Sequence, residues 1–321
     1  MKILVCGGGG FIGGHLVKKL KEMNHNVTSV DLKENIYSNS YPDKNLIGDL
    51  TNQEFVKDVL SHEYDEIYQL AADMGGAGYI FTGDNDSSVM YNSATINLNV
   101  LNCLKNNKKT KIFYSSSACI YPEYNQLDPD NPECKEDSAY PAAPDSEYGW
   151  EKLFSERLYL TFKKNYNLNI RIARFHNIFG PEGAWNNGKE KAPAAICRKV
   201  GMAKDGDHVE IWGDGLQTRS FLYIDECLEA VLRLMQSNFI GPVNIGSEQM
   251  ISINNLVKMV AKISNKNVKI NNVDGPTGVR GRNSNNDLIF KKLNWKPTLD
   301  LEYGLKKTYD WISEQIKLNE N

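Results

Sequence analysis

The chain has 321 residues, of which 41% are hydrophobic and 24% are charged, and its formal net charge is −3 at pH 7. This length and apolar content predict one large α/β domain with a smaller appended lobe. The slightly negative charge disfavours nucleic acid as the main partner. No stretch approaches the roughly 18 apolar residues of a membrane span, so no membrane partner is expected.

The first residues are apolar and run directly into a glycine-rich turn, which predicts a core strand and not a signal peptide. We therefore expect a cytoplasmic protein. The six cysteines form no Cys-x-x-Cys pair and have no metal-ligand spacing with the five histidines. Reduced thiols are expected, without a disulfide framework and without a metal site.

Strands and helices alternate through the first half of the chain. We expect strands at 2–6, 26–31, 66–70, 111–115 and 170–174, and helices from residue 13 to about 23, over 51–60 with Thr51 as N-cap, over 88–106, and from 148 to about 166. Repeated β-α alternation predicts a Rossmann-type, doubly wound parallel sheet with helices on both faces. Ligands should lie at the carboxyl ends of its strands.

A glycine motif follows the first strand and opens a helix. Gly7, Gly10 and Gly13 have the spacing of a dinucleotide-binding turn, in which the backbone approaches a pyrophosphate at the helix N-terminus. Asp31 ends the second strand, where a carboxylate accepts from ribose hydroxyls and repels a 2′-phosphate, which favours NAD over NADP; Lys33 acts against that preference. Asp49 is a candidate for the adenine edge, with a loop-capping role as the alternative.

A tyrosine and a lysine form the pattern Tyr148-x-x-x-Lys152. Side chains at this spacing share one helix face, so the ammonium can lower the phenol pKa from about 10 toward neutrality. A phenolate can then take a proton from a sugar hydroxyl while hydride leaves the same carbon. The pattern also fits an aromatic residue and a solvated charge on an ordinary helix. Ser117, at the end of a predicted strand, completes a possible catalytic set.

These three features together resemble the extended short-chain dehydrogenase/reductase family of NAD-dependent epimerases and dehydratases. Finer motifs are similar to its GDP-sugar 3,5-epimerases: 71–76 (AADMGG), 116–122 (SSACIYP), 174–178 (RFHNI), 189–195 (KEKAPAA), 212–221 and 278–284 (GVRGRNS). The resemblance covers nearly the whole chain. It implies NAD as cofactor, a GDP-sugar as substrate, and a homodimer formed by the helices near 88–106 and 146–166.

The residue type at position 119 distinguishes between the reactions of this family. Dehydratases carry an Asp-Glu pair where this chain has Ala118 and Cys119, so the acid needed to eliminate a hydroxyl is missing. A thiol can exchange a proton with a carbon that a neighbouring ketone has acidified, although a free cysteine is also a common small buried residue. Lys191, in a polar loop followed by Ala-Pro-Ala-Ala, is the predicted partner; a solvated lysine is the alternative.

The resemblance also assigns binding residues. Those expected at the cofactor are Gly7, Gly10, Phe11, Ile12, Gly13, Asp31, Asp49, Leu50, Ala71, Tyr148 and Lys152. Those expected at the substrate are Gly76, Ser117, Ala118, Cys119, Asn177, Glu190, Lys191, Ala192, Lys199, Gln217, Thr218, Arg219 and Arg282. Lys199, Arg219 and Arg282 suit a nucleotide diphosphate, while as isolated residues they would be ordinary surface charges.

We expect residues 1–175 to form the NAD-binding domain and 176–321 to form mainly a smaller C-terminal α/β substrate lobe, with some chain returning to the first domain. The tail 301–316 predicts an amphipathic closing helix. No linker rich in Pro or Gly separates the lobes, so they should pack around a cleft. A 4-epimerase or 4-dehydrogenase acting on another GDP-sugar, or an idle NAD-binding scaffold, remain alternative functions.

Overall fold

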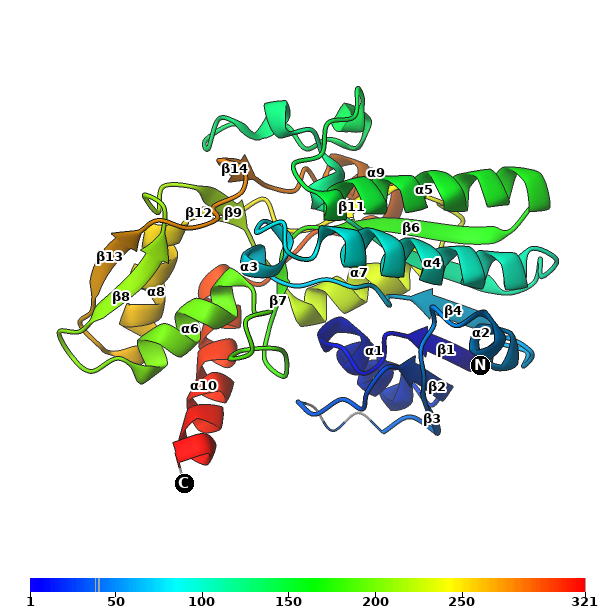
Figure 1. The fold of residues 1–321 in the computed structure, drawn as a ribbon, viewed down its shortest axis with the longest axis horizontal. Helices are drawn as coiled ribbons and strands as arrows, with labels where there is room; N and C mark the ends of the chain where they lie inside the picture. Colours follow the sequence, from blue (N-terminus) through cyan, green and yellow to red (C-terminus); the bar gives the residue numbers. More distant parts are fainter. Residues whose placement is uncertain (38, 40, 321) are drawn as a thin grey trace.

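A computed structural model describes residues 1–37, 39 and 41–320 of the chain. Seven parallel strands form the central sheet in the order β11-β6-β5-β4-β1-β2-β3 (Figure 1). The strands are β1 Lys2–Cys6, β2 Asn26–Asp31, β3 Lys44–Ile47, β4 Glu66–Gln69, β5 Lys111–Ser117, β6 Asn169–Phe175 and β11 Val243–Ile245. The predicted doubly wound α/β fold is confirmed.

Helices cover both faces of this sheet. Those of the first domain are α1 Phe11–Glu22, α2 Gln53–Val59, α4 Asp86–Leu104, α5 Glu147–Tyr166 and α7 Ile224–Gln236. Helices α4 and α5 lie side by side (Figure 1), and α1 packs with α7. Strand β1 shows why two layers form: Ile3 and Val5 pack in one apolar core with α1 and α7, and Leu4 and Cys6 pack in the other with α4. Alternate residues of a strand point to opposite faces.

The remaining elements form the second lobe and its connections. They are α3 Ala77–Ile80, β7 Ile178–Phe179, α6 Ala192–Met202, β8 His208–Trp212, β9 Thr218–Ser220, β10 Leu222–Tyr223, β12 Met250–Ser252, α8 Ile253–Ser264, β13 Lys269–Val273, β14 Gly281–Arg282, α9 Asp287–Leu293 and α10 Leu301–Glu320. Strand β8 pairs with β13, and β9 lies between β12 and β14. Chain from this half returns to the sheet as β11, which pairs with β6.

Two local expectations need correction. Helix α2 begins after Asn52, whose side chain accepts hydrogen bonds from the amides of Glu54 and Phe55, so the predicted cap at Thr51 is wrong by one residue. Asparagine is the better N-cap of the two because its short carbonyl group reaches these amides. Strand β3 was not predicted, since its four residues are half-buried or exposed and lack an apolar run.

A buried ion pair holds α5 on the sheet. Arg174 of β6 donates to Glu156 of α5 at 2.9 Å, and each side chain is 3% exposed. Ser116 of β5 donates to the same carboxylate at 2.5 Å. Breaking such a buried pair costs roughly 3–5 kcal/mol because one charge is left without a partner. The position of α5 relative to the end of β5 is therefore strongly fixed.

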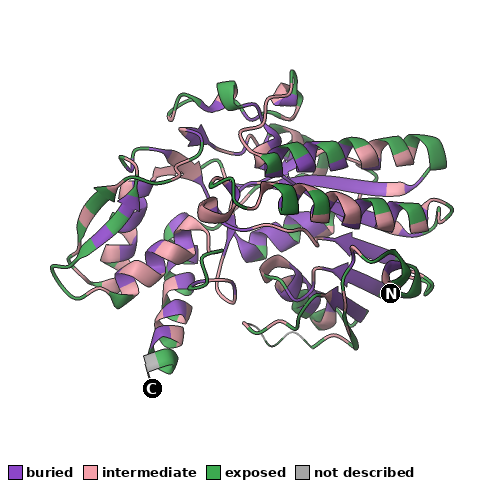
Figure 2. Cartoon of the chain, viewed as in Figure 1, coloured by how far each residue is buried: buried purple, intermediate pink, exposed green. Residues whose placement is uncertain are grey.

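Burial differs between the two sides of helices α4 and α5 (Figure 2). Their inner sides are buried on the sheet, whereas Tyr91, Leu98, Trp150 and Phe154 are exposed by 41–69%. Isolated exposed apolar residues are ordinary, but four large ones on two adjacent helices are typical of a surface that binds a partner.

Candidate functional site

A cavity of about 730 Å³ lies over the carboxyl ends of β1, β2, β4 and β5, and the segment before α6 closes it from the side of the second lobe. All the residues predicted at the cofactor line this cavity: Gly7, Gly10, Phe11, Ile12, Gly13, Asp31, Asp49, Leu50, Ala71, Tyr148 and Lys152. Ser117, Glu190 and Lys191 line it as well. The structure thus brings together residues that are up to 184 positions apart, from Gly7 to Lys191.

The glycine turn has no room for side chains. A Cβ atom on Gly13 would lie 2.0 Å from the Gly7 carbonyl oxygen, and Gly7 itself has a φ of +85°. Gly10 is the N-cap of helix α1 and offers its first amides no side-chain hydrogen bond. A bare backbone and a helix N-terminus together fit the pyrophosphate of a dinucleotide.

The two predicted carboxylates have different surroundings. Asp31 accepts a hydrogen bond from the Gly9 amide at 3.0 Å. Burial raises the pKa of this carboxyl above its ordinary value, and nearby backbone amides and the Lys33 charge oppose that shift. Asp49 accepts from the Thr51 amide at 2.8 Å, so it has the loop-capping contact and also lines the cavity.

Tyr148, Lys152 and Ser117 meet at the end of β5. Lys152 is buried, donates to the Ser115 carbonyl at 3.0 Å, and has its Nζ 5.7 Å from the centre of the Tyr148 ring. The Ser117 hydroxyl lies close enough to the Tyr148 phenol to lower its pKa, against the larger effect of burial. This arrangement places a hydroxyl, a phenol and an ammonium on one wall of the cavity.

The expected lowering of the phenol pKa is not found. Burial raises the pKa of Tyr148 well above its ordinary value, and the acidic groups of Cys119 and Glu151 add to the shift. Burial also lowers the pKa of Lys152, which weakens the ammonium as a source of positive charge. The loss of solvent around both groups has a larger effect on the pKa of Tyr148 than the charge of the lysine, and the spacing of the two residues does not reveal it.

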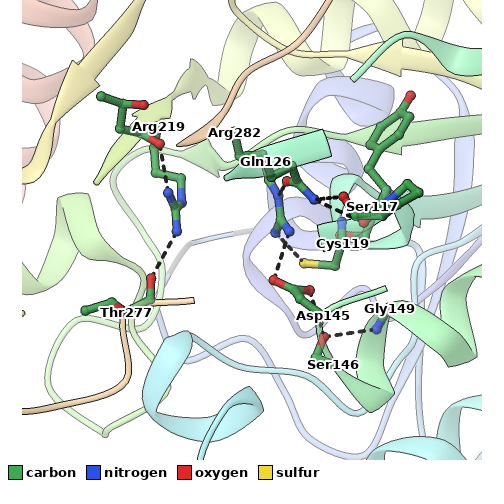
Figure 3. A network of polar contacts seen from close by, with 12 residues as sticks. Ser117, Cys119, Gln126, Asp145, Ser146, Gly149, Arg219, Thr277 and Arg282 are labelled. Atoms are coloured by element: carbon green, nitrogen blue, oxygen red, sulfur yellow. Dashed lines mark hydrogen bonds and ion pairs between the residues drawn. The ribbon is translucent and has the colours of Figure 1, made fainter. Parts of the chain in front are cut away.

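Cys119 lies in the short 3₁₀ helix η1 (Ala118–Ile120) directly after β5, and Ser117 caps this turn by accepting from the Cys119 amide at 3.2 Å. Its thiol is a partner of Arg282, whose Nη1 donates to Sγ at 3.0 Å (Figure 3). The same guanidinium donates from Nε to Gln126 at 2.5 Å and from Nη2 to Asp145 at 3.0 Å. A diphosphate role for Arg282 stays a prediction; the contacts seen join it to the thiol.

Lys191 is the residue immediately before α6, and it lines the cavity. Burial lowers the pKa of this ammonium, while the acidic groups of Cys119 and Cys227 act in the opposite direction. Lys191 and Cys119 are therefore close enough for their charges to interact. A lysine whose pKa is lowered spends more time as the neutral amine and can accept a proton.

The other residues expected at the substrate lie in the surrounding loops and strands. Asn177 donates to the Ser220 carbonyl at 3.0 Å, and Lys199 donates to the Glu210 carbonyl at 2.7 Å. Neither residue lines the cavity. The rest that lie outside its lining are Gly76, Ala118, Cys119, Ala192, Gln217, Thr218, Arg219 and Arg282. Of these, Gly76 donates its amide to the Lys189 carbonyl in the cavity wall.

Arg219 of β9 donates to the carbonyls of Thr218 and Thr277 at 2.8 and 3.0 Å (Figure 3). Burial lowers the pKa of Arg219 to about 10, and the Arg282 charge acts in the same direction. Carbonyl oxygens hold this guanidinium in place without neutralising it. It therefore retains the positive charge that an anionic ligand would need.

Two residues of this site were missed from the sequence. Gln126 and Asp145 both accept from Arg282, and Gln126 is completely buried. They lie 156 and 137 positions from the arginine. The fold alone brings them together, and no local pattern could have identified them.

Within residues 1–37, 39 and 41–320, no three side chains of His, Cys, Asp or Glu gather as metal ligands would. Over the same residues, none of the helices combines the length and the apolar character needed to cross a bilayer.

The fold and the cavity define a dinucleotide-dependent enzyme of nucleotide-sugar type, and sequence comparison identifies its family. The chain belongs to the NAD dependent epimerase/dehydratase family, whose sequence pattern matches residues 3–246. Because the family is NAD dependent, NAD is the dinucleotide for this cavity, in agreement with the glycine turn and Asp31.

Individual proteins of known activity resemble this chain in sequence or in structure. The GDP-mannose 3,5-epimerase of Arabidopsis thaliana is 46% identical over 319 residues, which cover 99% of this chain and 83% of that protein. Among solved structures, the UDP-glucuronic acid 4-epimerase of Bacillus cereus, in complex with UDP-glucuronic acid and NAD, aligns with a TM-score of 0.82 at 27% identity, covering 98% of this chain and all of that one. The UDP-glucose 4-epimerase of Thermotoga maritima shares the fold, with a TM-score of 0.87 at 24% identity and coverage of 98% and 100%.

Exchanging Asp31 for Ser tests the cofactor side of the cavity. The substitution removes the carboxylate that we expect to accept from the ribose hydroxyls and to repel a 2′-phosphate, so NAD should bind about 10–100-fold more weakly while the preference over NADP shrinks. Titration calorimetry with both dinucleotides measures this. Asp43→Asn, at an exposed carboxylate paired with Lys21, is the control and should leave both affinities unchanged. Wild-type protein that prefers NADP would contradict the assignment.

Proposed function

We propose that this protein is an epimerase that converts GDP-D-mannose to GDP-L-galactose, and to GDP-L-gulose when only C5 is inverted. The observation that carries the proposal is the thiol of Cys119, placed directly after β5 beside Tyr148 and hydrogen-bonded to Arg282. The 46% identity with the plant GDP-mannose 3,5-epimerase over nearly the whole chain supports it.

The first part of the reaction opens the sugar to proton exchange. NAD, when bound, supplies reversible hydride acceptance, which allows C4 to be oxidised and later reduced with no net redox change. Tyr148 takes the proton of the C4 hydroxyl, and Ser117, which lies close to the phenol, holds the C4 oxygen. Lys152, fixed by the Ser115 carbonyl, orients the ribose and stabilises the phenolate as it forms.

The second part inverts the carbons on either side of the ketone. A 4-ketone acidifies the protons at C3 and C5, so a base on one face of the ring and an acid on the other can exchange them. Cys119 and Lys191 are the two groups that we assign to this exchange. Burial lowers the pKa of Lys191, so this amine can take or return a proton.

We also propose where the nucleotide binds. The half-buried positive charge of Arg219, held by two carbonyl oxygens, suits the diphosphate, and Lys199 and Arg282 remain further candidates. Glu190 and Lys191 contribute side chains from the segment that closes the cavity, next to Ala192 at the start of α6. The second lobe, from residue 176 onward, then provides most of the sugar and nucleotide contacts.

Incubating the NAD-loaded protein with a panel of GDP-hexoses, followed by NMR of the products, tests the function. GDP-mannose should yield products inverted at C5 and C3. Tyr148→Phe should abolish all turnover. Cys119→Ala and Lys191→Ala should still form NADH with GDP-mannose but lose about 10²–10⁴-fold in epimerisation, since each removes only a proton carrier.

Cys103→Ala is the matched control for the thiol, because Cys103 is a partly exposed cysteine of α4. It should epimerise at the wild-type rate. Inversion at C4 alone would indicate a 4-epimerase, NADH release without inversion would indicate a dehydrogenase, and NAD binding with no sugar chemistry would indicate a scaffold. Cys119→Ala that epimerises like the wild type would exclude the thiol as a proton carrier.

Helices α4 and α5 suggest a homodimer. Their exposed side chains Tyr91, Leu98, Trp150 and Phe154 would be covered if the same face of a second copy packed against them. Light scattering at micromolar concentration should give twice the chain mass, and Trp150→Glu should shift the protein toward monomer. Met202→Glu, at a position of α6 in the other lobe that is 60% exposed where Trp150 is 41% exposed, should not. A wild-type monomer would contradict this proposal.

A further inference from the structure

Asp145 is a buried carboxylate to which the reaction described above gives no role. It stands directly before Ser146, the N-cap of α5. Its Oδ2 accepts from Nη2 of Arg282 at 3.0 Å, and the two side chains are only 5% and 6% exposed. A buried ion pair has a desolvation penalty that only good geometry and additional hydrogen bonds offset. The position of this pair beside the residues assigned to the reaction suggests a role in it.

The guanidinium of Arg282 is held on three sides. Nε donates to Gln126, Nη2 donates to Asp145, and Nη1 donates to the sulfur of Cys119 (Figure 3). A guanidinium is planar and rigid, so fixing two of its nitrogens also fixes the direction of the third. Gln126 and Asp145 therefore determine that Nη1 points at the thiol.

Cationic groups surround Cys119 on several elements. Lys152 on α5, Lys191 before α6, Arg219 on β9 and Arg282 on β14 all interact with it electrostatically, as does the phenol of Tyr148 on α5. Among these groups, Arg282 donates directly to the sulfur. A proton carrier for epimerisation must both accept a proton from carbon and return one, so the charge of the guanidinium at the sulfur has to be balanced.

We propose that Asp145 is a positioning residue for the epimerisation. It holds Arg282 with Nη1 directed at Cys119, and its negative charge balances the guanidinium so that Cys119 can alternate between thiol and thiolate. The role of Asp145 in epimerisation rests on the proposed function. Its effect on the ionisation of Cys119 rests on the geometry alone, because the Asp145 carboxylate balances the guanidinium that donates to the sulfur. Without that carboxylate, Cys119 becomes the acidic group that must balance Arg282.

The test measures the pH dependence of Cys119 alkylation by iodoacetamide in the NAD-loaded protein, with mass spectrometry of the peptide that contains Cys119. Asp145→Asn keeps an oxygen that can accept from Arg282 but removes the charge. The midpoint of alkylation should move about 1–3 pH units lower than in the wild type, the usual size of an effect from one nearby charge. Asp145→Glu restores the charge and should move the midpoint back toward the wild-type value.

The neighbouring pair of Asp214 and Arg280 is a matched control. Its N–O distance is also 3.0 Å and Arg280 is two residues before Arg282, but both side chains are 38–49% exposed. Asp214→Asn should leave the midpoint unchanged. If Asp145→Asn does not fold, Asp145→Ser removes the same charge with a smaller side chain. The proposal is overturned if the alkylation midpoint of the variant that lacks the Asp145 charge equals the wild-type midpoint or lies above it.

A kinetic comparison separates this inference from the proposed function. Asp145→Asn should still form NADH with GDP-mannose, since Tyr148 and Lys152 are unchanged, but its epimerisation should slow and its pH–rate profile should move with the alkylation midpoint. Alkylation needs no sugar, so a wild-type protein that fails to turn over GDP-mannose would refute the function and leave the electrostatic result intact. If the alkylation midpoint of Asp145→Asn is unshifted while the wild type turns over GDP-mannose normally, the role of Asp145 is refuted and the proposed function stands.

Discussion

A close contact between two backbones fixes the reacting groups relative to one another. Gly149, the second residue after the N-terminus of α5, lies so near the Cys119 carbonyl that a Cβ atom there would be 2.2 Å from its oxygen. No side chain fits this space, so α5 can approach the turn after β5 only through a glycine. Tyr148, next to that glycine, and Cys119 are consequently held on adjoining backbone. The Glu156–Arg174 ion pair fixes the same helix further along.

Proton chemistry then depends on chain segments that are distant in sequence. The end of β5 supplies Ser117 and Cys119, α5 supplies Tyr148 and Lys152, and the second half of the chain supplies Lys191 and Arg282. Tyr148, Lys152 and Arg282 are buried and Cys119 is half-buried. Burial moves the pKa values of Tyr148 and Lys191 in opposite directions, the first up and the second down. Groups whose pKa values are shifted in this way are typical of sites that transfer protons at constant pH. The hydrogen bond from Arg282 to Cys119 also links β14 to the turn after β5, so in the proposed mechanism the thiol depends on the packing of the two halves of the chain.

Local patterns in the sequence predicted most of the sheet and the cofactor cavity. The β-α alternation and the glycine turn are short-range features, and every residue expected at the cofactor lines the cavity. The errors have physical causes. Strand β3 is an exposed edge without an apolar run, and the phenol of Tyr148 is governed by burial, which no spacing reveals. Asp145 and Gln126 were missed because they meet Arg282 only after the chain has folded across more than 130 positions.

The central claim is that the protein exchanges protons at carbon next to a transient ketone, and one isotope measurement tests it most directly. The NAD-loaded protein is incubated with GDP-mannose in deuterated water, and the sugars are examined by NMR. The account predicts deuterium at C5, and at C3 in the doubly inverted product, with none at C4, because the C4 hydrogen moves as hydride and does not meet solvent. Inverted products without deuterium at C5 and C3, or deuterium at C4, would contradict it.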